Sequence, residues 1–337
     1  MNYVSVGDMA QTYLLRRHNV QLKTTMSRLT QELASGVQQD VGAAVKGDFT
    51  ALAAIDRSQR RIDSFSQSAS EADVFLSSQQ DALELIQNHA SQIGATMISS
   101  ASTTQASMID AVTGDAAQRF ASIVSALNVN VAGRYVFSGN TTDTAPLGAS
   151  EDIISALSGV ITGMTNATDI VSAVDDWFDA PTGGGGFLDF SYHGSDTALA
   201  PAQVSETDRA DLSLTAADPS LRNLLKGFAL ATLVSENLVP DDIDVRATLT
   251  RAAGEQIATA DAELTTVRSE LGTVQEIVSD AQVRNSAEKS SLAIAKNKLI
   301  GIDEYDSATA LEAVQTQLET LYTLTARLTG LSLTDYL

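Results

Sequence analysis

The strongest constraint on the fold is an apolar repeat that alternates in steps of three and four residues from Ile62 to Met97, with one polar exception at Gln79. A period of 3.5 kept over about five heptads is typical of a coiled-coil helix. A second seam with the same alternation runs from Ile257 to Ala281. Because a one-sided apolar stripe must be buried, we predict that the two seams pack antiparallel, with a third helix around 116–131 beside them. An ordinary bundle, in which each seam packs elsewhere, is the alternative.

Both ends of the chain carry the same kind of pattern. Chain ends usually fray unless something holds them, and each of these ends is a single helix with an apolar face. We therefore predict that the two ends pair with each other or wait for a partner, and we assign their apolar positions to inter-subunit assembly. These positions are Leu15, Leu22, Met26, Leu29 and Leu33 near the N-terminus, and Leu311, Val314, Leu318, Leu321 and Leu328 near the C-terminus.

Charge divides the chain further. The formal net charge is -21 over 337 residues, and residues 141–221 alone carry 13 acidic side chains against one basic side chain. Such a break in composition indicates a separate solvated domain. We predict a mainly α fold, a long antiparallel helical rod with paired termini and a small acidic α+β domain inserted at its distal end. The expected regions are a terminal assembly region (1–45 and 296–337), a helical rod (46–140 and 222–295) and the acidic insert (141–221).

The inserted region is predicted to be mixed. Residues 150–179 read as two short helices, "FLDFSY" after a tetraglycine loop reads as a strand, and residues 199–216 give weak strand signals. Asp218 and Pro219 predict the start of the next helix. The stretch "GRYVFSGN" is interpreted as the exit into the insert, in which Gly133 ends the third helix and residues 134–137 are extended. A plain hairpin edge without function is the alternative.

Little in the sequence indicates catalysis. The chain has no cysteine, its three histidines are far apart, and it contains no nucleophile elbow, Walker A loop or dinucleotide fingerprint. Trp177 is interpreted as a core residue. No apolar run is long enough to span a membrane, and the acidic balance argues against nucleic acid as a partner. We expect no enzyme, no cofactor and no metal, and the N-terminus lacks the pattern of a cleaved signal peptide.

Three motifs carry a resemblance to a known family. The stretch "GRYVFSGN" resembles a signature of flagellar hook–filament junction proteins, the hook-associated class of the flagellin superfamily, through Gly133, Arg134, Tyr135, Phe137, Ser138 and Gly139. The C-terminal "LTGLSLTDYL" is similar to the terminal signature of the same class, and "RLTQELASGVQ" (28–38) resembles a superfamily segment. After Gly36 the chain departs from the family pattern, since only Asp40 or Asp48 could stand in for the usual acidic cluster.

The resemblance implies a function. Such a protein is exported to the bacterial flagellum without a cleaved signal and polymerises between hook and filament through its terminal helices. Its partners would be a neighbouring hook-associated protein, flagellin, copies of itself and an export chaperone. The alternatives are filament flagellin itself, or a non-enzymatic secreted adhesin or scaffold on a helical stalk.

Overall fold

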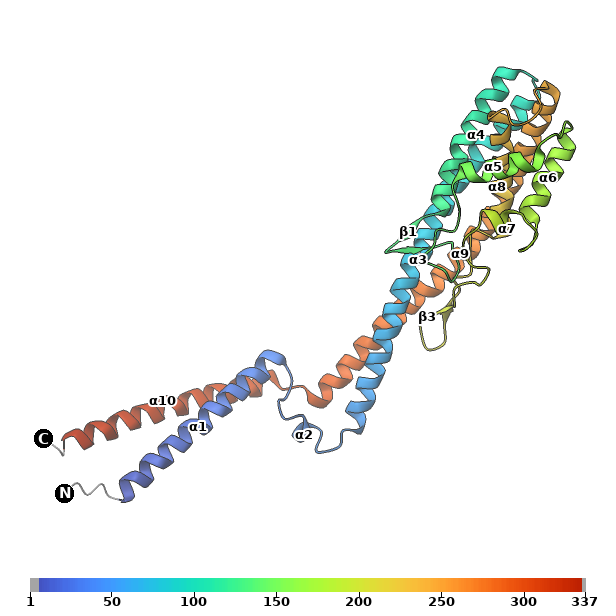
Figure 1. Cartoon of the computed structure of the whole chain (residues 1–337). Coiled ribbons are helices and arrows are strands. Elements are labelled where there is room, and N and C mark those ends of the chain that lie inside the picture. Colours follow the sequence, from blue (N-terminus) through green and yellow to red (C-terminus); the bar gives the residue numbers. More distant parts are fainter. Residues whose placement is uncertain (1–5, 335–337) are drawn as a thin grey trace. The chain divides into compact units, whose positions relative to one another are not determined.

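The computed structural model describes the backbone of residues 6–334 and the burial of side chains from 9 to 327. The described chain is mainly α, as predicted, with ten helices and two sheets of two short strands each (Figure 1). It divides into two compact units. Unit 1 comprises residues 1–63 and 286–337, and unit 2 comprises residues 64–285. Two long helices, α3 (Thr50–Ala101) and α9 (Ile243–Ile300), contribute to both units.

The two predicted seams form the core of unit 2. In the α3 seam every position from Ala69 to Met97 is buried, and in the α9 seam all positions are buried except Val267 and Val274, which are partly buried. The two helices run antiparallel here, since Gln87 Nε2 donates to Thr265 Oγ1 (2.9 Å) and Arg268 pairs with Glu84 (3.2 Å). The helices approach closely at two glycines. A Cβ on Gly254 would lie 2.9 Å from the carbonyl oxygen of Gly94.

The third helix, α4, spans Ala106–Leu127, so it begins ten residues earlier than the predicted helix and ends four residues before it. It packs along α8 (Pro219–Ser235). The start of α8 was predicted correctly, because the side chain of Asp218 accepts a hydrogen bond from Ser220 N (2.9 Å) and Pro219 occupies the first helical position. Most of α8 is buried, which makes it the central helix of unit 2.

The acidic insert (141–221) contains the two predicted helices, α5 (Ser150–Ile161) and α6 (Ala167–Asp179). The strand predicted at "FLDFSY" is wrong, because Phe187–Phe190 forms the short helix α7. The backbone of this segment is paired within its own turn, since Phe190 N donates to Gly186 O (3.1 Å) and Ser191 N to Phe187 O (3.0 Å). The carboxylate of Asp189 also accepts hydrogen bonds from Gly183 N (2.7 Å) and Gly185 N (2.6 Å) of the preceding loop. The strands of the insert are β3 (Ala202–Gln203) and β4 (Arg209–Ala210), which pair with each other.

Three side-chain amides attach irregular backbone to the helices of unit 2. Buried Gln79 of α3 donates to the carbonyl oxygens of Val136 (2.7 Å) and Leu214 (3.1 Å). Buried Asn285 of α9 donates to Val204 O (2.8 Å). At the end of α4, Asn128 donates to Leu147 O and accepts from Leu147 N. The polar exception in the first seam is therefore an attachment point for the segments that leave the helical core.

Trp177 of α6 is a core residue, as interpreted. It is 6% exposed and makes edge-on contacts with the rings of Phe178 and Phe187, at centroid distances of 5.0 and 6.1 Å. Two basic residues of α8 hold the polar edge of the same helix. Lys226 pairs with Asp175 (3.3 Å) and Asp179 (2.9 Å), and Arg222 donates to Phe178 O (2.6 Å).

Unit 1 contains α1 (Val6–Ser35), the short α2 (Val41–Ala44), α10 (Glu304–Thr334), and the ends of α3 and α9. Helices α1 and α10 lie side by side (Figure 1). We call them the terminal pair. In the part of α3 and α9 that belongs to this unit, Asp63 pairs with Lys289 (2.6 Å) and Asp56 with Lys296 (2.8 Å), which is an antiparallel arrangement.

Candidate assembly interface

The predicted assembly residues lie along the terminal pair, but few of them are fully buried. Leu29 (7% exposed) and Leu318 (6%) are the buried ones. Leu33 is 37% exposed, and the side chain of Leu328 lies outside the described part of the chain. The other six are partly buried: Leu15, Leu22, Met26, Leu311, Val314 and Leu321. The seam therefore faces a helix of the same chain and still leaves apolar surface in contact with water.

A second apolar stripe on α1 was not found by the sequence analysis. Met9 (61% exposed), Tyr13 (67%) and Val20 (64%) point to solvent. At 100° per residue these three positions fall within about 40° of one another, on the side of the helix away from the seam. The spacing of 4 and 7 residues could have revealed the stripe, but the leucine heptads on the other face dominate the pattern.

Helix α10 also carries exposed apolar and aromatic side chains. Tyr305 is 79% exposed, Tyr322 50% and Leu324 49%. The ring of Tyr322 lies against α1, with Lys23 Nζ 5.9 Å from its centroid. Hydrogen bonds from Asn19 and Lys23 lower the pKa of the Tyr322 hydroxyl. The terminal pair is thus held partly by polar contacts along the edge of its seam.

The two breaks that delimit the terminal pair are joined by backbone hydrogen bonds. Gly36, in the superfamily-like segment 28–38, has a φ of +71°, the left-handed conformation that commonly ends a helix. Immediately after it, Val37 forms an antiparallel bridge with Gly301, Gln38 N donates to Ile300 O (2.8 Å), and Ile302 N donates to Gly36 O (3.1 Å). The break after α1 and the break after α9 therefore form one small junction.

Buried Glu32 stabilises the α1 side of this junction. It is 5% exposed, it pairs with Arg28 (2.8 Å), and its Oε1 accepts a hydrogen bond from Gln39 N (3.0 Å). The two acidic residues that could replace the family's cluster are helix caps. Asp40 caps α2 through Ala43 N (2.9 Å), and Asp48 accepts from Thr50 N (2.9 Å) at the start of α3. Hydrogen bonds from Thr50 also lower the pKa of the Asp48 carboxyl.

The stretch "GRYVFSGN" begins as a hairpin, so the prediction that Gly133 ends the third helix is wrong. Strands β1 (Asn130–Val131) and β2 (Arg134–Tyr135) pair across a turn in which Ala132 (φ +52°) and Gly133 (φ +84°) are both left-handed. Helix α4 ends earlier because Asn128, an amide that also binds Leu147, occupies its C-cap. Gly133 and Arg134 are exposed, and Tyr135 is partly buried.

The second half of the same stretch is buried backbone that holds the insert. Phe137, Ser138 and Gly139 are buried. Phe137 O accepts from Ala216 N (2.9 Å), and Ser138 Oγ donates to Thr144 O (2.6 Å). Gly139 has a φ of +64°, and a Cβ there would lie 2.7 Å from two carbonyl oxygens of the segment 195–197, so only glycine fits. This half of the motif has a structural role in unit 2.

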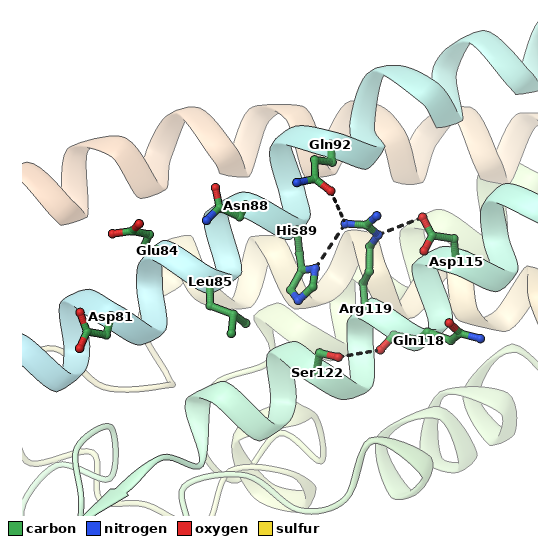
Figure 2. Close-up of a pocket in the computed structure, with 10 residues that line it drawn as sticks. All are labelled: Asp81, Glu84, Leu85, Asn88, His89, Gln92, Asp115, Gln118, Arg119 and Ser122. Atoms are coloured by element: carbon green, nitrogen blue, oxygen red, sulfur yellow. Dashed lines mark hydrogen bonds and ion pairs between the residues drawn. The ribbon is translucent and has the colours of Figure 1, made fainter.

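A groove with many polar side chains lies between α3 and α4 and has a volume of about 680 Å³. Figure 2 shows Arg119 of α4 reaching between His89 and Gln92 of α3 and Asp115 of its own helix. Arg119 Nη1 lies 3.3 Å from His89 Nδ1, and burial together with this guanidinium lowers the pKa of His89. These contacts join two helices, so we assign Arg119 a structural role between α3 and α4.

The other two histidines, His18 and His193, are exposed. In the part of the chain that the structure describes, no group of three or more His, Cys, Asp or Glu side chains is arranged to hold a metal ion. No helix within the described residues is both long and apolar enough to cross a bilayer.

Comparisons with known proteins give two findings. Residues 255–337, which include the C-terminal part of α9 and all of α10, match the model of the bacterial flagellin C-terminal helical region. The fold is similar to the solved structure of a protein described as a flagellar hook-associated protein from Vibrio parahaemolyticus, at 17% identity and a TM-score of 0.50, over 74% of this chain and 95% of that one. A comparison with curated proteins finds no match.

The matched region contains one helix of the terminal pair and the second apolar seam. The similarity in fold extends beyond it to most of the chain. The two findings therefore give a C-terminal region similar to that of bacterial flagellin and a fold similar to that of a flagellar hook-associated protein.

Proposed function

We propose that this protein is a non-enzymatic axial component of the flagellum that assembles at the junction between hook and filament through its terminal helices. The observation that carries the proposal is the exposed apolar surface of the terminal pair. Its two helices bury one leucine each, and Met9, Tyr13 and Val20 form an exposed stripe on α1. Apolar side chains arranged along one face of a helix favour contact with another helix.

The mechanism is burial by association. Each large apolar side chain removed from water contributes about 1.5–3 kcal/mol. A stripe repeated on every copy would therefore favour packing of many copies around a common axis, since a contact between two different surfaces generates rings or helical filaments. In each copy, the nine seam residues whose side chains the structure describes lie along the terminal pair. In this proposal they act in assembly by presenting the stripe.

The partners in the proposal are copies of the same chain, the hook-associated neighbour on one side and flagellin on the other, outside the cell. An export chaperone that covers the terminal helices before assembly would explain how such a surface stays soluble. The domain assignment made from the sequence, with the terminal region at 1–45 and 296–337, remains part of the proposal.

A substitution in the stripe tests the proposal. In a strain that lacks the native gene, the variant Met9→Ser/Tyr13→Ser/Val20→Ser should leave hooks without filaments and release unassembled flagellin into the medium. The matched control is Arg17→Ser/Gln21→Ser/Thr24→Ser, at exposed polar positions of the same helix, which should assemble normally. Normal filaments from the stripe variant would contradict the proposal.

Deletion of the gene distinguishes the junction role from filament flagellin. Loss of a junction protein leaves flagellin in the culture medium, whereas loss of the flagellin removes it. Electron microscopy of the deletion strain, together with the protein content of the medium, decides between the two.

A further inference from the structure

One part of unit 1 differs in charge from the rest of the protein. It consists of residues 50–63 of α3 and 286–300 of α9, and we call it the basic ribbon. It contains six basic and three acidic residues, a net charge of +3 in a chain whose total is -21. The densest cluster is "RSQRR", in which Arg57, Arg60 and Arg61 are all exposed.

Two of the three acidic residues of the ribbon are held in ion pairs with its lysines. Asp56 and Asp63 pair with Lys296 and Lys289 of α9. These pairs neutralise two carboxylates with two lysines, so the remaining four basic residues and one acidic residue still give the ribbon a net charge of +3. Patches of one sign attract surfaces of the opposite sign and steer their association.

The ribbon also lacks a core of its own. Its buried apolar side chains are Leu52, Ile62 and Ile300, and Ile294 is 60% exposed. Few apolar side chains of the ribbon are buried, so its exposed faces can pack against a further surface. Both the charge and the exposed apolar side chain favour a partner that is acidic and helical.

This chain contains such a surface in its acidic insert, which has a net charge of -12. The ion pairs described for the insert involve Asp175, Asp179 and Asp208. Four other carboxylates are exposed on its two successive helices: Glu151 and Asp152 on α5, and Asp169 and Asp176 on α6. Helices α5 and α6 pack together, so they present these groups from one helical layer.

We propose that the basic ribbon of one copy binds the α5–α6 face of the acidic insert of a neighbouring copy. The inference rests on the proposed function, because it requires many copies side by side. It gives the insert a role in assembly that is separate from that of the terminal pair. The contact joins two different surfaces, so it repeats from copy to copy in one direction.

Charge reversal tests the contact in full-length protein expressed in the deletion strain. The ribbon variant Arg57→Glu/Arg60→Glu/Arg61→Glu and the insert variant Glu151→Lys/Asp152→Lys/Asp169→Lys/Asp176→Lys should each be lost from sheared flagella. Their far-UV circular dichroism should match that of the wild type, because all seven side chains are exposed. The control, Arg251→Glu, reverses an exposed arginine of α9 in unit 2 and should incorporate normally.

Co-expression of the two variants, each with a different tag, is the experiment that decides whether the two surfaces bind each other. Each variant alone opposes like charges, but a ribbon-reversed copy can bind an insert-reversed neighbour, so both tags should return to the sheared flagella. Incorporation of either variant alone at the wild-type level, or failure of the pair to recover, would overturn the inference. Absence of the wild-type protein from flagella would instead overturn the proposed function.

Discussion

The two units of this chain contain the same kind of apolar-striped helix but bury it to very different extents. In unit 2, α3 and α9 are covered by α4, α8 and the insert, and a single hydrophobic core extends from Ala69 to Ala281. Among the side chains of unit 1 that the structure describes (residues 9–63 and 286–327), the buried apolar ones are Leu29, Leu52, Ile62, Ile300 and Leu318, and none of them belongs to that core. The difference lies in the number of neighbouring helices, since both units carry apolar repeats.

This difference shows where stability resides in one chain and where it depends on partners. A helix gains most of its stability in water from burial of its apolar face, so unit 2 has the contacts of an independently stable domain. Unit 1 is held by polar contacts, such as the hydrogen bond from Gln38 N to Ile300 O, and by an apolar seam that is only partly buried. Local unfolding therefore costs less free energy in unit 1 than in unit 2. Association with other copies can add the stabilising contacts that unit 1 does not make within its own chain.

The largest test of the contrast replaces one leucine in each unit. Leu83 is 0% exposed in unit 2, and its replacement by alanine should lower the free energy of unfolding by about 2–5 kcal/mol, because a cavity remains. Leu22 is partly exposed in unit 1, so Leu22→Ala should lower it by about 1 kcal/mol or less.

Fluorescence of the single tryptophan, Trp177, reports unfolding of unit 2 during urea titration. Leu83→Ala should shift its midpoint strongly, and Leu22→Ala should leave it unchanged. If both substitutions moved the midpoint by the same amount, the division into a self-sufficient unit and a dependent unit would be wrong.

A second test concerns the attachment of the insert to unit 2. Gln79→Met keeps an unbranched side chain of similar length in the seam but removes both hydrogen bonds to Val136 O and Leu214 O. Leaving buried carbonyl groups without donors should lower stability by about 1–3 kcal/mol. Exposed Gln67→Met on the same helix is the control, and equal effects of the two substitutions on the Trp177 transition would contradict the role of Gln79.

The features that could be predicted from the sequence are mainly those of the helical core of unit 2. The seams of α3 and α9 were predictable because each is a regular repeat of apolar residues that the fold buries. Local capping was also predictable at Asp218, whose side chain lies at its own helix end and accepts a hydrogen bond there. Periodicity and capping depend on residues close together in the chain, and these are the signals that a single sequence carries.

The misses have two causes, contacts between distant parts of the backbone and short local hydrogen bonds that periodicity does not include. The Gly36–Gly301 junction joins segments about 265 residues apart, as in the hydrogen bond from Gln38 Nε2 to Gly301 O (separation 263). Propensity rules treat each segment alone, so they cannot find such a contact. The "FLDFSY" strand failed for the second reason, because alternation over six residues did not include the binding of Asp189 to the preceding glycine loop. The exposed stripe on α1 was hidden by stronger leucine repeats.

The smallest expected effect is a dependence of unit 2 stability on pH through His89. Burial, and then the Arg119 guanidinium, lower the pKa of His89 below its ordinary value of 6.5, although Asp115 acts in the opposite direction. The unfolded chain therefore binds the proton more tightly than the folded chain. The contribution of neutral His89 is fully present above pH 6.5 and decreases as the pH falls below that value.

This dependence can be separated from other titrations. Hydrogen bonds lower the pKa values of the Asp189 and Asp208 carboxyls below their ordinary value of 3.8, so their effects on stability appear in more acidic solution. Between pH 7.5 and 5.5, wild-type protein should lose more stability than His89→Gln, as measured by urea unfolding of Trp177 at both pH values. The glutamine keeps a hydrogen-bond acceptor for Arg119 but cannot be protonated. An identical pH dependence in both proteins would show that the folded chain does not lower the pKa of His89, so that protonation of this side chain does not destabilise the packing of α3 against α4.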